Sequence, residues 1–102
     1  MHALGSTAMA EYLVRIVLTR PSGMDDDSWT AVLAEEGKVG RAYREQGTIR
    51  RIWRVPGTTA NVGVWSAPDA SRLHELLADL PAFAHMTIQV EALAEHYLEA
   101  TP

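Results

Sequence analysis

The centre of the chain reads TIRRIWRVPGTTANVGVWS over residues 48–66. Its two halves, 48–55 and 60–66, are rich in β-branched and aromatic residues, which favour extended strands. The four residues PGTT between them include a proline and a glycine and are typical of a tight turn. Two strands joined by so short a turn pair in opposite directions. The sequence therefore predicts an antiparallel β-hairpin in the middle of the chain.

The chain before this hairpin predicts one strand and one helix. Residues 12–19 alternate between two sets of side chains, which is the period of a strand, and a proline and a glycine then favour a turn. The acidic residues at 25–27 suit the positive end of a helix dipole. An apolar stripe at helical spacing continues to about Gln46, and Gly47 is the expected end of the helix. The residues of this stripe are Trp29, Val32, Leu33, Val39 and Tyr43.

The chain after the hairpin predicts a second helix and a fourth strand. The helix begins near Pro68, carries a stripe of leucines and ends at Pro81. Residues 86–92 predict the strand, and 93–100 predict a short helical tail. The resulting order, β-α-β-β-α-β, is the ferredoxin-like pattern. It predicts an α+β fold in which a four-stranded antiparallel sheet carries both helices on one face.

Length, charge and composition exclude several classes of protein. The 102 residues predict one ferredoxin-like domain over 11–98, preceded by a flexible arm over 1–10. The formal net charge of −4 argues against nucleic acid and membranes as partners, since both favour basic surfaces. The chain has no cysteine, no histidine pair at metal-ligand spacing and no glycine-rich phosphate loop, so we expect no metal. No apolar run approaches a membrane span, and we expect a cytoplasmic protein.

Strand parity divides the side chains of the predicted sheet between its two faces. The side chains expected to face the helices are Val14, Ile16, Leu18, Val62, Val64, Ile88 and Val90. Those expected on the opposite face are Leu13, Arg15, Val17, Asn61, Gly63, Trp65, Thr87, Gln89 and Glu91. This second face mixes apolar residues with a few strong polar groups, which predicts a pocket or an interface sealed by a second subunit. The alternative is a solvated face with incidental apolar residues.

Two kinds of residue are candidates for chemistry. Arg51 or Arg54 can hold a substrate carboxylate by a bidentate contact, and the alternative is a set of surface ion pairs. Glu36 lies inside the apolar stripe of the first helix. Burial there would raise its pKa toward the range useful for a general base, whereas at the edge of the stripe its carboxylate would reach solvent.

Two segments of the chain resemble the muconolactone isomerase family. They are GTIRRIWRV at 47–55 with Gly57, Ala60 and Asn61 after it, and LHELL at 73–77 with LPAF at 80–83 and Met86 after it. Val14, Arg15 and Glu36 also fit the family's pattern. The resemblance extends from about Tyr12 to His96, which is nearly the whole chain.

The resemblance implies a ferredoxin-like subunit that pairs into a dimeric α/β barrel, a homo-oligomer that in the family grows to a decamer. It implies no cofactor and no metal. The implied substrate is a small lactone, and the implied reaction moves the ring double bond of muconolactone by proton transfer, in the degradation of aromatic compounds through the β-ketoadipate pathway.

This reaction needs a base, a donor for the charge on the lactone oxygen, a cation for the acetate arm and an apolar wall. We assign the base to Glu36. The expected substrate-binding residues are Asn61 or Arg15 for the lactone oxygen, Arg54 or Arg15 for the acetate arm, and Trp53 and Trp65 for the wall.

The sequence departs from the family's pattern at Leu13 and Arg51, where histidine is usual. If either histidine carries the proton in the family, this chain would be inactive on muconolactone, and it could instead be a paralogue that acts on a different lactone or enone. Two further alternatives stay open at this point. One is a cofactor-free oxygenase or cyclase of the same barrel group, acting on an aromatic or polyketide compound. The other is a ligand-binding paralogue without catalysis.

Overall fold

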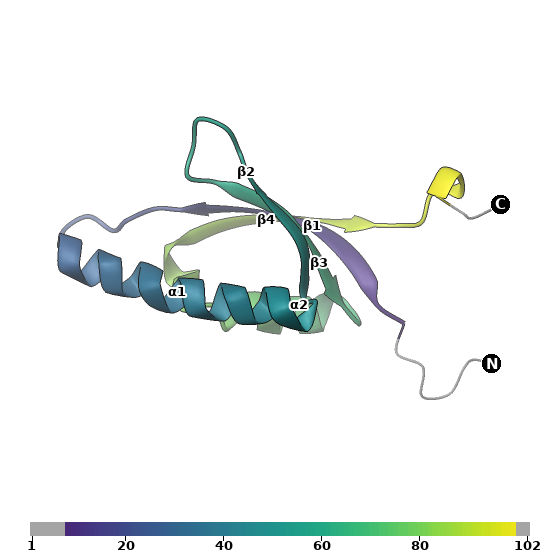
Figure 1. Ribbon diagram of the computed structural model, residues 1–102, viewed down its shortest axis with the longest axis horizontal. Helices are drawn as coiled ribbons and strands as arrows, with labels where there is room; N and C mark the ends of the chain where they lie inside the picture. Colours follow the sequence, from purple (N-terminus) through teal and green to yellow (C-terminus); the bar gives the residue numbers. More distant parts are fainter. Residues whose placement is uncertain (1–7, 100–102) are drawn as a thin grey trace.

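A four-stranded sheet and two helices packed on one of its faces make up the structure, a computed structural model that describes residues 8–99 (Figure 1). The helices and strands are β1 (Ala10–Leu18), α1 (Asp26–Gln46), β2 (Ile49–Arg54), β3 (Asn61–Ala67), α2 (Ala70–Ala78) and β4 (Met86–Leu93). Two short 3-10 turns, η1 (Phe83–His85) and η2 (Tyr97–Glu99), flank the last strand. The predicted order of elements is confirmed, and the tail forms only the single turn η2.

The strands lie in the order β2-β3-β1-β4, and every neighbouring pair is antiparallel. This is the ferredoxin-like arrangement predicted from the hairpin outward. Strands β1 and β3 are central, whereas β2 and β4 are the edges. Both helices lie on the same side of the sheet, and the last part of the chain leads away from the helices (Figure 1).

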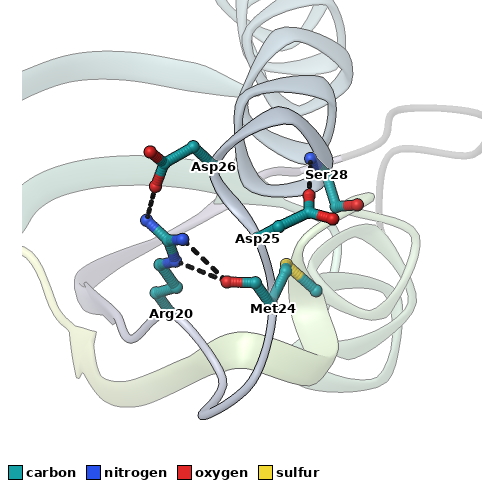
Figure 2. Close-up of polar contacts among 5 residues, drawn as sticks. All are labelled: Arg20, Met24, Asp25, Asp26 and Ser28. Carbon is teal, nitrogen blue, oxygen red and sulfur yellow. Dashed lines mark hydrogen bonds and ion pairs between the residues drawn. The ribbon is translucent and has the colours of Figure 1, made fainter.

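The ends of α1 are fixed by the residues that flank it. Asp25 caps the first turn, since its carboxylate accepts a hydrogen bond of 2.7 Å from the backbone N–H of Ser28 (Figure 2). At the other end Gly47 adopts a left-handed φ of 82°, and its N–H donates to the carbonyl of Arg44. A left-handed C-terminal residue favours glycine, which explains the sharp end of this helix.

The hydrophobic core lies between the sheet and the helices. Its buried side chains are Tyr12, Val14 and Ile16 of β1, Ile49 of β2, Trp65 and Ala67 of β3, Tyr43 of α1, and Leu73, Leu76, Leu77 and Leu80 of the α2 region. Trp65 is only 1% exposed and meets the ring of Tyr43 edge-on, with 5.7 Å between ring centroids. The hydroxyl of Tyr43 donates to the carbonyl of Leu76, which ties α1 to α2.

The face of β3 that meets the helices differs from the prediction. The register pairs Asn61 with Ile16, Gly63 with Val14 and Trp65 with Tyr12, so all three β3 residues share the helix face with the core of β1. The expectation that Asn61 and Trp65 face away from the helices, and that Val62 and Val64 face toward them, is wrong.

The reason is that β3 is a central strand with apolar residues on both faces. The alternation of side chains along the strand then assigns residues to two faces, but it does not show which face meets the helices. Burying the indole of Trp65 removes a large apolar surface from water, and the indole also gains the edge-on contact with Tyr43. Val62 and Val64 remain half-buried on the open face, the side of the sheet without helices.

The flexible arm predicted over 1–10 lies outside the described residues for its first seven positions. Strand β1 already includes Ala10. The domain limits of 11–98 therefore stay a prediction. Neither of the described helices combines the length and the apolar character that crossing a membrane requires.

Candidate functional site

A cavity of ≈ 390 Å³ opens on the helix side of the sheet, where the first half of α1 passes over the strand ends. It is lined by Leu18, Arg20, Trp29, Leu33, Arg54 and Thr59. Trp29 is half-buried, and its ring packs edge-on against His85 with 5.8 Å between centroids. The wall is therefore largely apolar, and two arginines contribute its charge.

Arg54 is a cation at this cavity that no carboxylate of residues 8–99 neutralises. Its Nη1 donates to the backbone carbonyls of Thr59 and Ala60. None of the ion pairs formed by the described residues includes Arg54. An arginine whose charge has no acidic partner is suited to bind an anionic group from a ligand.

Arg20, the second arginine of the lining, has its charge satisfied within the loop between β1 and α1 (Figure 2). Its Nη1 lies 2.7 Å from the carboxylate of Asp26, and its Nε and Nη2 both donate to the carbonyl of Met24. These contacts join the loop to the first turn of α1, the helix that carries Trp29. Arg20 therefore holds the cavity wall in place, and Arg54 supplies the available charge.

Two buried polar atoms on the helix face of the sheet belong to β3. Asn61 pairs across the sheet with Arg54 on one side and with Ile16 on the other. Its Oδ1 and the Nε1 of Trp65 are buried, and neither has a hydrogen-bond partner among the described residues. Buried polar atoms in proteins are nearly always hydrogen-bonded, so these two mark a place for a further polar group.

Glu36 is half-buried on α1, three residues beyond Leu33. Its Oε1 accepts a hydrogen bond of 2.9 Å from the backbone N–H of Ala82, which lies just after α2. Burial raises the pKa of Glu36, and the hydrogen bond from Ala82 partly opposes this rise. Glu36 does not line the cavity, but it lies on the same helix as Trp29 and Leu33, which do.

Residues 10–99, nearly the whole chain, match the family profile described as muconolactone delta-isomerase.

The chain belongs to the muconolactone delta-isomerase family.

Individual relatives agree with this assignment. The chain is 30% identical over 83 residues to muconolactone delta-isomerase 2 of Acinetobacter lwoffii, covering 81% of this chain and 86% of that protein. It is 32% identical over 85 residues to the muconolactone delta-isomerase of Cupriavidus pinatubonensis, covering 83% and 92%. The crystal structure of a muconolactone isomerase superposes with a TM-score of 0.79 at 32% identity, covering 84% of this chain and 90% of that chain.

The residues expected from the family resemblance divide between the two faces of the sheet. Arg54, Asn61 and Trp65 lie on the helix face. Arg15 and Trp53 lie on the open face, where both pair with Val62 across the sheet. The predicted apolar wall of Trp53 and Trp65 is therefore not a single wall.

The two departures from the family's histidine pattern also lie on the open face. Leu13 and Arg51 both pair with Val64, one from β1 and the other from β2. The guanidinium of Arg51 lies over the ring of Trp53, 4.9 Å from its centroid. The substitutions at Leu13 and Arg51 thus leave the helix-side cavity of this family member untouched.

Sequence reasoning assigned Trp29 and Leu33 to the core stripe of the first helix and missed their place in the cavity. Leu33 is 41% exposed. Spacing gives no signal for this role, because an apolar stripe that packs on a sheet and one that lines a hollow have the same helical period.

Proposed function

We propose that this protein is a cofactor-free isomerase that moves the ring double bond of muconolactone, or of a closely related lactone, within the helix-side cavity. The observation that carries the proposal is the pairing of an apolar cavity of ≈ 390 Å³ with an arginine, Arg54, that has no acidic partner among the described residues. The reaction itself is the one for which the family and its members are named, the isomerisation of muconolactone.

The chemistry of the substrate matches this cavity. Muconolactone is a small flat ring with an acetate arm, so it presents one carboxylate and one apolar body. Arg54 binds the carboxylate, and Trp29 and Leu33 cover the ring. Asn61, the cross-strand neighbour of Arg54, faces the lactone oxygen.

In this proposal the ring of the bound lactone extends past Leu33 to meet Glu36, which lies one turn further along α1 and outside the cavity lining. Glu36 takes the proton from the ring carbon next to the ring oxygen, and the electron pair moves through the double bond to the carbonyl. The same proton then returns to the carbon beside the carbonyl. The reaction therefore needs no cofactor, and the substrate and the product carry the same charge. Two observations support Glu36: its pKa is raised by burial, and only one of its two oxygens is hydrogen-bonded within the described structure.

A second copy of the chain covers the open face. This face carries the apolar residues Leu13, Val17, Val62, Val64 and Trp53 together with the charged residues Arg15, Arg51 and Glu91. Because charges of both signs lie on one patch, a two-fold axis can bring opposite charges of the two copies together. Such a dimer is the unit from which a larger ring, as the resemblance implies, is built.

Arg15 and Trp53 take part in substrate binding only if this dimer encloses a second chamber. The hollow beside Arg15 on the open face measures ≈ 110 Å³, much less than the helix-side cavity. We therefore place the lactone on the helix side.

The direct test is to add muconolactone to the purified protein and to follow migration of the double bond by the change in absorbance. We expect turnover that stays proportional to enzyme. We also expect Arg54→Gln to raise KM by about 10- to 100-fold, the loss of one charge-assisted contact. The control is Arg72→Gln, which removes a surface partner of Glu75 on α2. A folded wild-type protein without turnover would refute the proposal.

A further inference from the structure

We infer that Thr58 is a positioning residue of the substrate site, because its hydroxyl fixes the turn between β2 and β3, and this turn holds the guanidinium of Arg54 in place for a carboxylate. The inference rests on the proposed isomerase function and deepens it, since Arg54 binds the acetate arm in that proposal. Among residues 8–99 the cavity lining includes Thr59 but not Thr58, so Thr58 acts on the substrate only through its neighbours.

The backbone of the turn is set by Pro56 and Gly57. Gly57 has a φ of 80°, which glycine adopts readily and other residues rarely do. The N–H of Thr58 donates to the carbonyl of Val55 at 3.2 Å, and proline followed by a glycine of positive φ is the pattern of a type II turn. A turn of this kind leaves the backbone little freedom, so the side chain of Thr58 has a defined place.

The hydroxyl of Thr58 makes two hydrogen bonds across the turn. It donates to the carbonyl of Val55 at 2.9 Å and accepts from the backbone N–H of Ala60 at 3.0 Å. A hydroxyl has a single proton to donate, so one of these bonds uses its proton and the other uses its oxygen. The hydroxyl therefore connects the residue after β2 with the residue before β3.

The peptide unit between Thr59 and Ala60 links this hydroxyl to Arg54. Its N–H, which belongs to Ala60, donates to the hydroxyl of Thr58, and its C=O, which belongs to Thr59, accepts from the Nη1 of Arg54. A trans peptide unit is planar and its N–H and C=O point in opposite directions, so fixing one end also fixes the other. Without the hydroxyl this unit is free to rotate and to withdraw its carbonyl from Arg54.

The contacts with the turn engage one corner of the guanidinium and leave an edge of it available. The side-chain hydrogen bonds that Arg54 makes within the described structure all use Nη1, which donates to the carbonyls of Thr59 and Ala60. A carboxylate is bound best side-on, by two parallel hydrogen bonds from one edge of a guanidinium, and the edge formed by Nε and Nη2 suits this geometry. An arginine that is already held loses less freedom when the carboxylate arrives, which favours binding.

This arrangement predicts an effect on binding and not on the chemical step. The contact between Arg54 and the acetate arm is the same in the bound substrate and in the transition state, because the arm takes no part in the proton transfer. A residue that acts only through this contact should therefore change KM and leave kcat as it is.

The test compares variants that remove the hydroxyl with one that keeps it. Thr58→Val preserves the branched shape and should raise KM for muconolactone by about 3- to 10-fold, the range for one neutral hydrogen bond, with kcat within about twofold. Thr58→Ala should give the same rise. Thr58→Ser keeps the hydroxyl and should restore the wild-type KM. Circular dichroism checks that the three variants are folded.

A second measurement tests whether the effect passes through Arg54. In a protein that already carries Arg54→Gln, adding Thr58→Val should change KM by less than about twofold, because the guanidinium that the turn holds is absent. A general loosening of the cavity by the loss of the hydroxyl would instead raise KM by the same factor in both backgrounds.

The outcomes separate this inference from the function on which it rests. No turnover by the wild-type protein would overturn both. Wild-type turnover together with an unchanged KM in Thr58→Val would overturn only the role of Thr58. The same holds if Thr58→Ser raises KM as much as Thr58→Val does, or if the rise in KM is equal with and without Arg54.

Discussion

The burial and the hydrogen bond of Glu36 could not be predicted from its position in the sequence. The spacing of the helix left two outcomes open, burial within the stripe or contact with solvent at its edge. The structure places the side chain between them, half-buried and tied to the N–H of Ala82. The contact that decides its position comes from a residue 46 positions away in the chain, so the local spacing of apolar residues does not predict it.

At the catalytic level we expect Glu36→Gln to lower kcat by at least 100-fold, the usual range for loss of a general base being about 10²–10⁴. The amide oxygen of glutamine still accepts from Ala82, so the fold should be kept. The matched control is Glu35→Gln, which changes the adjacent carboxylate that pairs with Lys38 on the surface. Steady-state assay of both variants with muconolactone checks this, and an equal rate in Glu36→Gln would remove Glu36 from the mechanism.

The raised pKa of Glu36 also makes a prediction about stability. Because burial raises the pKa in the native state, the folded protein binds this proton more tightly than the unfolded chain. The free energy of unfolding should therefore carry a contribution that falls as pH rises from the ordinary glutamate pKa through the raised native one. Glu36→Gln should lack this contribution. Urea unfolding of both proteins across mildly acidic pH measures the difference, and parallel pH curves would contradict it.

At the scale of elements, the order and type of the strands and helices follow from local signals. The PGTT turn, the leucine stripe and Gly47 each mark a boundary through the conformation they favour. Local signals do not predict which face of each strand meets the helices. Strand β3 is apolar on both faces, and the packing of Trp65 on Tyr43 decides which of them lies against the helices. For this reason the sequence identified Arg54 and Asn61 as candidates but did not place them side by side on the helix face.

Two glycines in these elements make a matched pair for measuring backbone crowding. A Cβ at Gly63 would lie 2.8 Å from the backbone carbonyl oxygen of Arg51, whereas one at Gly40 in α1 would meet nothing within 4 Å. We expect Gly63→Ala to destabilise the protein by about 1–3 kcal/mol through overpacking. Gly40→Ala should stabilise it by about 0.5–1 kcal/mol, because alanine favours the helix.

Urea unfolding midpoints of the two alanine variants provide the measurement, and each variant serves as the control for the other. A shift of the same sign and size in both would show that the backbone around Gly63 yields without cost.

At the scale of the whole molecule, the sheet is covered on one side and bare on the other (Figure 1). The helix side contains the core and the cavity. The open side exposes Trp53 by 44%, with Val62 and Val64 only half-buried beside it. Arg15 and Glu91 lie near the same residues. A layer this apolar on its bare side favours contact with a second sheet.

We expect Val64→Glu, at the centre of this open face, to reduce the particle mass measured by light scattering toward that of one chain. The reason is that two opposed sheets would bury two like charges close together. Ala34→Glu, on the exposed side of α1, should leave the mass unchanged. Circular dichroism confirms that both variants are folded. A wild-type protein that is already monomeric, or an unchanged mass in Val64→Glu, would contradict the proposed dimer.

The separation of the two faces has a practical side for anyone who wishes to redirect this catalyst. Trp29, Leu33 and Thr59 border the cavity from a helix and a turn, and none of them belongs to a strand. A library randomised at these three positions therefore samples new substrate shapes while every side chain of the bare sheet layer stays native. Selection for a new ring system and selection for quaternary structure can then proceed as independent rounds of directed evolution.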